Sequence, residues 1–145
     1  MRTNAAGIAL IKKFESCDLK AYPDPGTGDE PWTIGWGHVG ANIYPGMEIS
    51  QEQADKYLDE DLAKFERGIS QLVRVTLNEN QFSALVCFSY NVGLHNLSVS
   101  HLLIKVNNKD FKGAAEEFLR WNKSNGEVLE GLTERREAEK ELFLS

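Results

Sequence analysis

The stretch that decides the fold reads Phe14-Glu15, Tyr22-Pro23-Asp24 and Trp32-Thr33-Ile34-Gly35-Trp36-Gly37-His38, with short linking segments between the three parts. It holds two carboxylates nine positions apart, followed by a run in which glycines alternate with strand-forming residues. Hydrolysis of a glycosidic bond needs such a pair, with one carboxyl group protonated and the other ionised. The stretch therefore predicts a two-carboxylate active site, and the rest of the chain is interpreted as its scaffold.

Composition limits the class of protein. The chain has 145 residues, enough for one domain with a hydrophobic core, and no apolar run is long enough to cross a bilayer. The net charge of −6 argues against nucleic acid as a partner. The residues after Met1 lack the apolar core of a secretory signal, so we expect either a protein made in the cytoplasm or a processed form of a longer one. Cys17 and Cys87 show no metal-binding spacing and favour two buried free thiols, with a disulfide as the open alternative.

The amino-acid composition changes once within the first 50 residues. Apolar residues at helical spacing predict a helix over residues 4–15, capped by Asn4. Residues 17–50 contain all four prolines and many glycines, which indicates a small antiparallel sheet lobe. Its strand-like pieces are residues 19–22, 32–36 and 47–49, and residues 23–28 have turn composition.

The remainder of the chain has helical periodicity. Ser50 and Gln53 form a capping-box signal for a long connecting helix over residues 51–70. Residues 71–145 are expected to be helical throughout, as one larger lobe on which helix 4–15 packs. Helix boundaries are expected at Thr76 (with Glu79 as a second capping box), Gly93, Ser98 or Ser100, Asp110 and Thr133. The predicted fold class is α+β, with both lobes in a single domain over residues 1–145 and a cleft between them.

The two carboxylates have different expected environments. Glu15 lies at the C-terminal end of the first helix, where the helix dipole disfavours a further negative charge, which suits a general acid. Asp24 lies in a polar turn that suits an ionised base, although a turn aspartate is often present only to bind its own backbone. Asp29, in the same loop, is the open alternative for the second carboxylate. A Thr33 hydroxyl beside the aspartate could hold a water molecule, and His38 is expected to bind a carboxylate.

These motifs together resemble the phage-type lysozymes, glycoside hydrolase family 24, and among them the lambdoid endolysins. The family pattern is a helix-end Glu, then Tyr-x-Asp, then Thr-Ile-Gly-x-Gly-His. The resemblance continues through Phe88-Ser89-Tyr90-Asn91-Val92-Gly93 and reaches Gly131-Leu132-Thr133-Glu134-Arg135-Arg136-Glu137-Ala138-Glu139. It covers essentially the whole chain and implies a lysozyme-like fold.

The resemblance also implies roles. Glu15 would be the general acid, Asp24 the base and Thr33 the residue that positions water, in a muramidase that cleaves the β-1,4 bond between N-acetylmuramic acid and N-acetylglucosamine of peptidoglycan with inversion. His38, Tyr90 and Asn91 would be substrate-binding residues. No metal or cofactor would be needed. The protein would be a monomer that stays in the host cytoplasm, leaves it through a holin, and lyses the host by cutting its wall.

The chain departs from the family in two respects. Gly26–Pro31 lengthens the gap between Asp24 and Thr33, which keeps Asp29 open as the working acid. The acidic charge predicts weaker wall binding, with weaker salt dependence, than in basic relatives.

Other functions remain as alternatives. A non-catalytic peptidoglycan-binding module on the same fold would bind walls without releasing reducing ends. A hydrolase of chitin or chitosan would be separated by its substrates, and a lytic transglycosylase by anhydro products.

Overall fold

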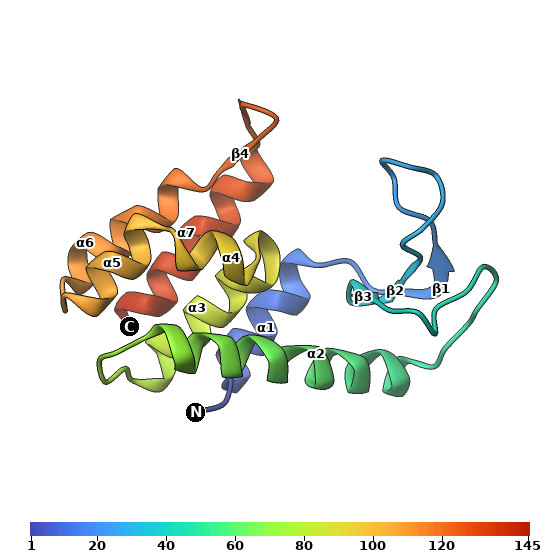
Figure 1. The fold of residues 1–145 in the computed structure, drawn as a ribbon, viewed down its shortest axis with the longest axis horizontal. Helices are drawn as coiled ribbons and strands as arrows, with labels where there is room; N and C mark the ends of the chain where they lie inside the picture. The colour runs from blue at the N-terminus through green and yellow to red at the C-terminus, as the bar shows by residue number, and fades with distance from the viewer. The chain divides into compact units, whose positions relative to one another are not determined.

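The computed structural model describes residues 1–145 and divides into two compact units (Figure 1). Residues 12–63 form one unit, called here the sheet unit. Residues 1–11 together with residues 64–145 form the other, called the helical unit. Helices α1 (Ala5–Phe14) and α2 (Gln51–Leu72) each contribute residues to both units. The description of the whole chain as one catalytic domain stays a prediction.

The sheet unit is built on a three-stranded antiparallel sheet in the order β1-β2-β3. Its strands are β1 (Asp18–Tyr22), β2 (Thr33–Gly35) and β3 (His38–Val39), and Thr33 is paired with Tyr22 on one side and Val39 on the other. The predicted strand at residues 47–49 is instead an isolated bridge, in which Ile49 N–H donates to the Leu19 carbonyl at 2.9 Å. The sheet covers a small core of Ala21, Ile34, Ile43, Trp32, Met47, Ile49 and Tyr57.

Gly35 explains why β2 can lie against α2. Its φ is 65°, and a Cβ at this position would be 3.4 Å from both Cα and Cβ of Ala54 on α2. A glycine accepts this backbone conformation without the steric cost of a side chain. Gly35 therefore allows β2 to come close to another backbone, that of the first turns of α2.

The helical unit packs short helices around one buried helix. Its elements are α3 (Glu79–Val92), α4 (Leu94–Ser98), α5 (His101–Asn107), α6 (Phe111–Glu117), the 3₁₀ helix η1 (Phe118–Arg120) and α7 (Glu130–Leu144). Every residue of α3 from Phe82 to Ser89 is buried, and α7 packs along this helix. Edge-to-face contacts of Phe88 with Phe118 and Trp121 join α3 to η1 and the residue that follows it.

The start of α1 is fastened to α3 within the helical unit. Asn4 caps α1, because Gly7 N–H donates to its side-chain oxygen at 3.0 Å. The backbone N–H of Asn4 donates to Ser83 Oγ at 2.9 Å, and its side-chain amide donates to Asn80 at 2.8 Å. Gly7 is buried here, and a Cβ on it would be 2.7 Å from Ser83 Cβ.

Most of the predicted helix boundaries are confirmed. Ser50, Ser100 and Asp110 each accept a hydrogen bond from the backbone N–H three residues later, at 3.0–3.1 Å. Gly93, at φ 96°, ends α3. The second capping box is wrong by two residues, because Asn78 and Gln81 make the reciprocal pair, not Thr76 and Glu79.

The prediction of unbroken helix after residue 71 is wrong. The chain forms a β-hairpin of β4 (Lys123–Ser124) and β5 (Glu127–Val128), seen in orange before α7 in Figure 1. Asn125 and Gly126 turn it with φ of 52° and 81°, the left-handed values of a type I′ turn. Thr133 is not a helix cap, since α7 begins at Glu130 and the Thr133 hydroxyl accepts from Asn122 at 3.1 Å.

No helix of the protein combines the length and the apolar content that are needed to cross a bilayer.

Candidate active site

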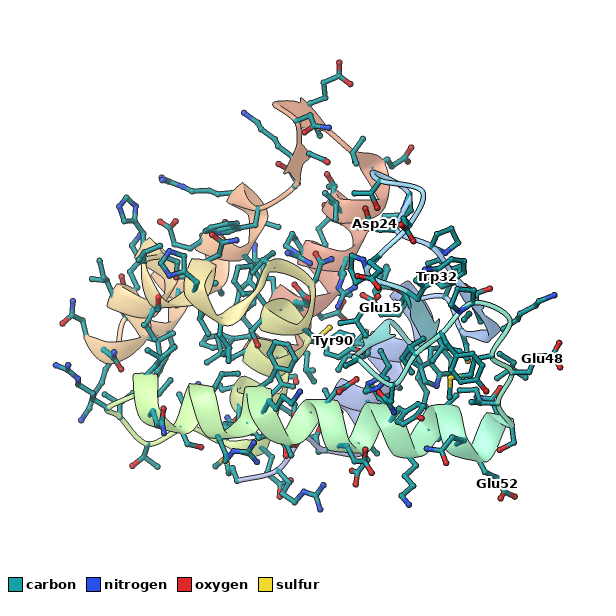
Figure 2. All side chains as sticks on the ribbon, turned by 45° about the vertical axis from the view of Figure 1, so that its right-hand side comes forward. Glu15, Asp24, Trp32, Glu48, Glu52 and Tyr90 are labelled. Atoms are coloured by element: carbon teal, nitrogen blue, oxygen red, sulfur yellow. The ribbon has the colours of Figure 1, made fainter.

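Glu15 follows directly on the last residue of α1 and is half-buried (Figure 2). Its negative charge acts on Tyr22. The pKa of the Tyr22 phenol is raised mainly by burial, and in addition by the carboxylates of Asp18 and Glu15. A side-chain hydrogen bond with Thr33 acts on the same phenol in the opposite direction. The end of α1 and strands β1 and β2 therefore bring Glu15, Tyr22 and Thr33 into one electrostatic neighbourhood.

Asp24 closes the loop between β1 and β2. Its Oδ2 atom accepts hydrogen bonds from the backbone N–H groups of Gly26 at 3.0 Å and Thr27 at 3.1 Å. The Asp24 carbonyl also accepts from Gly28 N–H at 2.7 Å. The backbone-binding role of a turn aspartate is thus present, and the same contacts fix the orientation of the carboxylate.

Asp29 lies opposite Asp24 in this loop. The Asp24 N–H donates to the Asp29 carbonyl at 2.9 Å, so the two residues are adjacent across the turn. The side chain of Asp29 accepts a long hydrogen bond of 3.4 Å from the indole of Trp32. The choice between the two carboxylates stays a prediction in favour of Asp24.

His38 makes the carboxylate contact that its sequence context predicted. Its Nδ1 atom lies 2.8 Å from Oδ2 of Asp61 on α2, and both side chains are largely buried, with exposed fractions of 12% and 15%. The imidazole also stacks on Tyr57, with ring centroids 4.1 Å apart and planes 5° from parallel. These contacts join β3 to α2, and a part for His38 in substrate binding stays a prediction.

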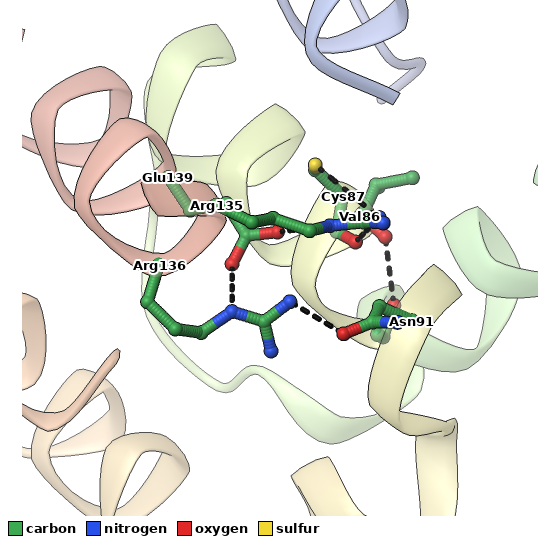
Figure 3. Close-up of polar contacts among 7 residues, drawn as sticks. Val86, Cys87, Asn91, Arg135, Arg136 and Glu139 are labelled. Carbon is green, nitrogen blue, oxygen red and sulfur yellow. Dashed lines mark hydrogen bonds and ion pairs between the residues drawn. The ribbon is translucent and has the colours of Figure 1, made fainter. Parts of the chain in front are cut away.

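The other two predicted substrate-binding residues belong to the helical unit. Tyr90, at the C-terminal end of α3, packs its ring on Phe65 with centroids 5.3 Å apart. Asn91 is exposed, and its side-chain oxygen accepts a 2.6 Å hydrogen bond from Arg136 (Figure 3). Glu15, Asp24, Thr33 and His38 are all residues of the sheet unit.

Comparison with known proteins identifies the family. Residues 12–139 match the phage lysozyme family. The chain belongs to that family. This phage lysozyme chain is 47% identical over 145 residues to an endolysin of Bacillus phage B103, covering 100% of this chain and 55% of that protein. It therefore spans about half the length of the first curated relatives that it matches.

Solved structures confirm the predicted α+β, lysozyme-like fold. The muramidase domain of SpmX from Asticaccaulis excentricus has a TM-score of 0.90 and 36% identity, with 99% of this chain and 98% of that one covered. A mutant of P22 lysozyme has a TM-score of 0.88 and 39% identity, with 100% and 99% covered. The small antiparallel sheet and the mainly helical remainder of the phage lysozyme chain are shared features of these structures.

An open cavity of about 580 Å³ lies at the β3 edge of the sheet. It is lined by Glu30 and Pro31 of the Gly26–Pro31 segment, by Trp32, and by residues 39–41 and Ile43. Val39, which lines the cavity, is paired with Thr33 on the neighbouring strand. The cavity is therefore one strand away from the predicted water-positioning residue. Glu30 and Pro31, at the end of the Gly26–Pro31 segment, thus contribute surface close to β2.

A buried charge cluster on α7 was not predicted. Glu139 lies between two arginines, with its carboxylate oxygens 3.1 Å from Nε of Arg135 and 2.9 Å from Nε of Arg136 (Figure 3). All three side chains are at most 3% exposed. Arg135 also donates to the Cys87 carbonyl at 2.9 Å on α3. Burial raises the pKa of Glu139, against the lowering effect of Arg136 and Arg135.

The signal for this cluster was present in the sequence as the spacing Arg135-Arg136-x-x-Glu139, which puts the glutamate three and four positions after the arginines on one helix. Cys87 lies beside the cluster as a free, buried thiol, as expected. Cys17 is also free, but it is only half-buried, so the prediction that it is buried was wrong. No group of three or more His, Cys, Asp and Glu side chains is arranged to hold a metal ion.

Proposed function

We propose that this chain is the catalytic part of an endolysin, a muramidase that hydrolyses the β-1,4 bond between N-acetylmuramic acid and N-acetylglucosamine in bacterial peptidoglycan and so lyses the host cell. Membership of the phage lysozyme family supports the activity. The observation that carries it is the meeting of Glu15, Tyr22 and Thr33 in one electrostatic neighbourhood, with Asp24 fixed in the adjoining loop.

In the proposed reaction Glu15 donates its proton to the glycosidic oxygen as the bond breaks. Asp24 accepts a proton from water, which attacks the anomeric carbon on the opposite face of the sugar, and Thr33 holds that water. Such a reaction inverts the anomeric centre and requires the two carboxyl groups to be roughly 6.5–9.5 Å apart. Each proton transfer has a named side chain of this protein as donor or acceptor, and no step calls for a metal or cofactor.

Replacement of Glu15 by Gln tests the acid. The amide keeps the size of the side chain but has no proton to donate, so hydrolysis of purified peptidoglycan should fall by about 10²–10⁴-fold while the protein stays folded. Release of soluble muropeptides and the far-ultraviolet circular dichroism spectrum measure the two quantities. Unchanged release by Glu15→Gln would remove Glu15 from the reaction.

A matched pair of variants separates the two candidate bases. Asp24→Asn should lose far more activity than Asp29→Asn, because only the Asp24 carboxylate is fixed by two backbone N–H groups. The reverse ranking would assign the role to Asp29. A wild-type protein that binds walls but releases no reducing ends would instead be a non-catalytic binding module.

The remaining parts of the proposal concern partners and place of action. His38, Tyr90 and Asn91 would help to bind the glycan, and the protein would act as a monomer. It would stay in the host cytoplasm until lysis and reach the periplasmic wall through a holin. This course rests on the resemblance to endolysins, and expression in a bacterium with and without a holin gene tests it: lysis without a holin would contradict it.

A further inference from the structure

One carboxylate oxygen on the first turns of α2 accepts from three different segments of the sheet unit. Asp55 Oδ1 lies 2.8 Å from Nε1 of Trp36, 3.2 Å from the side-chain nitrogen of Gln51 and 3.3 Å from Nζ of Lys12. The Lys12 ammonium also lies over the Trp36 ring, 5.4 Å from its centroid. Lys12, Trp36 and Asp55 therefore form one closed group of contacts.

Two of the three partners of Asp55, Lys12 and Trp36, lie close in the chain to residues of the proposed active site. Lys12 is in the last turn of α1, three positions before Glu15. Trp36 follows directly on β2, three positions after Thr33. The two segments that carry the acid and the water-positioning residue are thus both fastened to a single side chain of α2.

The residue before Asp55, Ala54, also lies against the end of β2. Ala54 is fully buried and lies so near Gly35, the last residue of β2, that a Cβ on this glycine would be 3.4 Å from it. The strand end is therefore held twice, by packing of Gly35 on Ala54 and by the hydrogen bond from Trp36 to Asp55. Because a shift of one ångström in a reacting group can cost a large factor in rate, contacts that fix this strand end bear on the chemistry.

We propose that Asp55 is a positioning residue for the hydrolysis, which acts through Lys12 and Trp36 to hold Glu15 and Thr33 in register. The proposal rests on the proposed function for its kinetic consequence. The pKa of Asp55 is lowered, first by the hydrogen bond from Trp36, and also by Gln51 and Lys12, so the carboxylate is ionised at neutral pH and available to all three donors.

The contacts of Asp55 are partly exposed to solvent, and this determines what its loss should do. The side chains of Lys12 and Asp55 are 36% and 43% exposed, so their ion pair adds little to the stability of the fold. Loss of Asp55 should therefore leave the protein folded and act on the rate. This distinguishes a positioning residue from a structural one.

The experiment measures kcat and KM of Asp55→Ala on soluble glycan strands, with Glu60→Ala as the control. Glu60 is another acid of α2, exposed to solvent. We expect Asp55→Ala to lower kcat about tenfold with KM changed less than about threefold, in line with a sub-ångström displacement, and Glu60→Ala to change neither. Asp55→Asn, which keeps an acceptor for Trp36, should recover most of the lost rate.

A double-mutant cycle shows whether the effect passes through the tryptophan. Trp36→Phe keeps the ring but removes the donor, so the double variant with Asp55→Ala should be about as slow as Asp55→Ala alone. The proposal would be overturned if the two substitutions lowered kcat additively. It would also be overturned if the fall in kcat of Asp55→Ala matched the unfolded fraction of the protein, or if Asp55→Ala had the same kcat and KM as Glu60→Ala.

Hydrogen exchange makes the test independent of activity. The amides of Glu15 and Thr33 should exchange faster together in Asp55→Ala, with the amides of α3 unchanged. If the wild-type protein shows no hydrolysis, the proposed function fails and the exchange rates still decide whether Asp55 holds these two segments. Exchange at Glu15 and Thr33 equal to that of wild type would refute the positioning role.

Discussion

Replacement of Glu139 by Gln should destabilise the fold strongly, because the buried cluster on α7 would lose the Glu139 carboxylate. The substitution preserves shape and removes the negative charge between Arg135 and Arg136, which are 3% and 0% exposed. Each arginine would keep a contact with α3, Arg135 with the Cys87 carbonyl and Arg136 with Asn91. Two buried positive charges would then lack the negative charge that now lies between them.

The magnitude follows from the geometry of the cluster. With nitrogen–oxygen distances of 3.1 and 2.9 Å, the charge centres are roughly 4 Å apart, and each pair is worth about 4 kcal/mol at an effective dielectric constant of 20. Part of this is offset, because burial of the Glu139 carboxylate costs free energy, as its raised pKa records. Loss of one member of a buried ion pair costs about 3–5 kcal/mol net, and we expect that range.

Urea denaturation of the wild type, Glu139→Gln and Glu137→Gln measures the effect. Glu137 is exposed on the same helix, and its replacement should change the free energy of unfolding by less than about 0.5 kcal/mol. For a chain of this size, a loss of 3–5 kcal/mol also corresponds to a fall in Tm of about 6–20 °C. If the free energy of unfolding of Glu139→Gln is within about 1 kcal/mol of the wild-type value, the ion pairs of Glu139 make no large net contribution to stability.

Two further predictions concern stability. Burial raises the pKa of the Cys87 thiol well above its usual value, so above about pH 8.5 only the unfolded chain releases this proton, and the free energy of unfolding falls by up to about 1.4 kcal/mol per pH unit. Cys87→Ala should remove this component from urea titrations between pH 8 and 10, and an unaltered pH slope would contradict it. Gly7→Ala should cost about 1–3 kcal/mol because its Cβ would lie 2.7 Å from Ser83 Cβ, whereas Gly131→Ala on α7 has open space around it and should gain about 0.5–1 kcal/mol. Thermal unfolding of the two glycine variants compares them, and equal effects would refute the packing argument.

Local signals predicted the elements that depend on local chemistry. Asn4, Ser100 and Asp110 cap helices where their side chains and the following apolar spacing indicated, because a cap needs only a few neighbouring residues. The hairpin at residues 123–128 was missed although Asn125-Gly126 is a strong turn signal, since its strands are two residues long and give no alternating pattern.

The prediction of the site rests on the order of its motifs. The sequence indicated Glu15, Asp24 and Thr33, and it indicated that His38 binds a carboxylate, but not that the partner is Asp61, 23 positions away. The three donors to Asp55 come from α1, the end of β2 and α2 itself, and only the folded chain brings them to one oxygen. The order of residues cannot show such contacts, because tertiary packing determines them.

Mass spectrometry of the products from purified Gram-negative peptidoglycan, beside a Glu15→Gln control, tests the central claim most directly. The account predicts muropeptides that end in a reducing N-acetylmuramic acid, formed by the wild type and absent from the control. Anhydro-muramic products would contradict hydrolysis and indicate a lytic transglycosylase. Wall binding without any products would contradict catalysis itself.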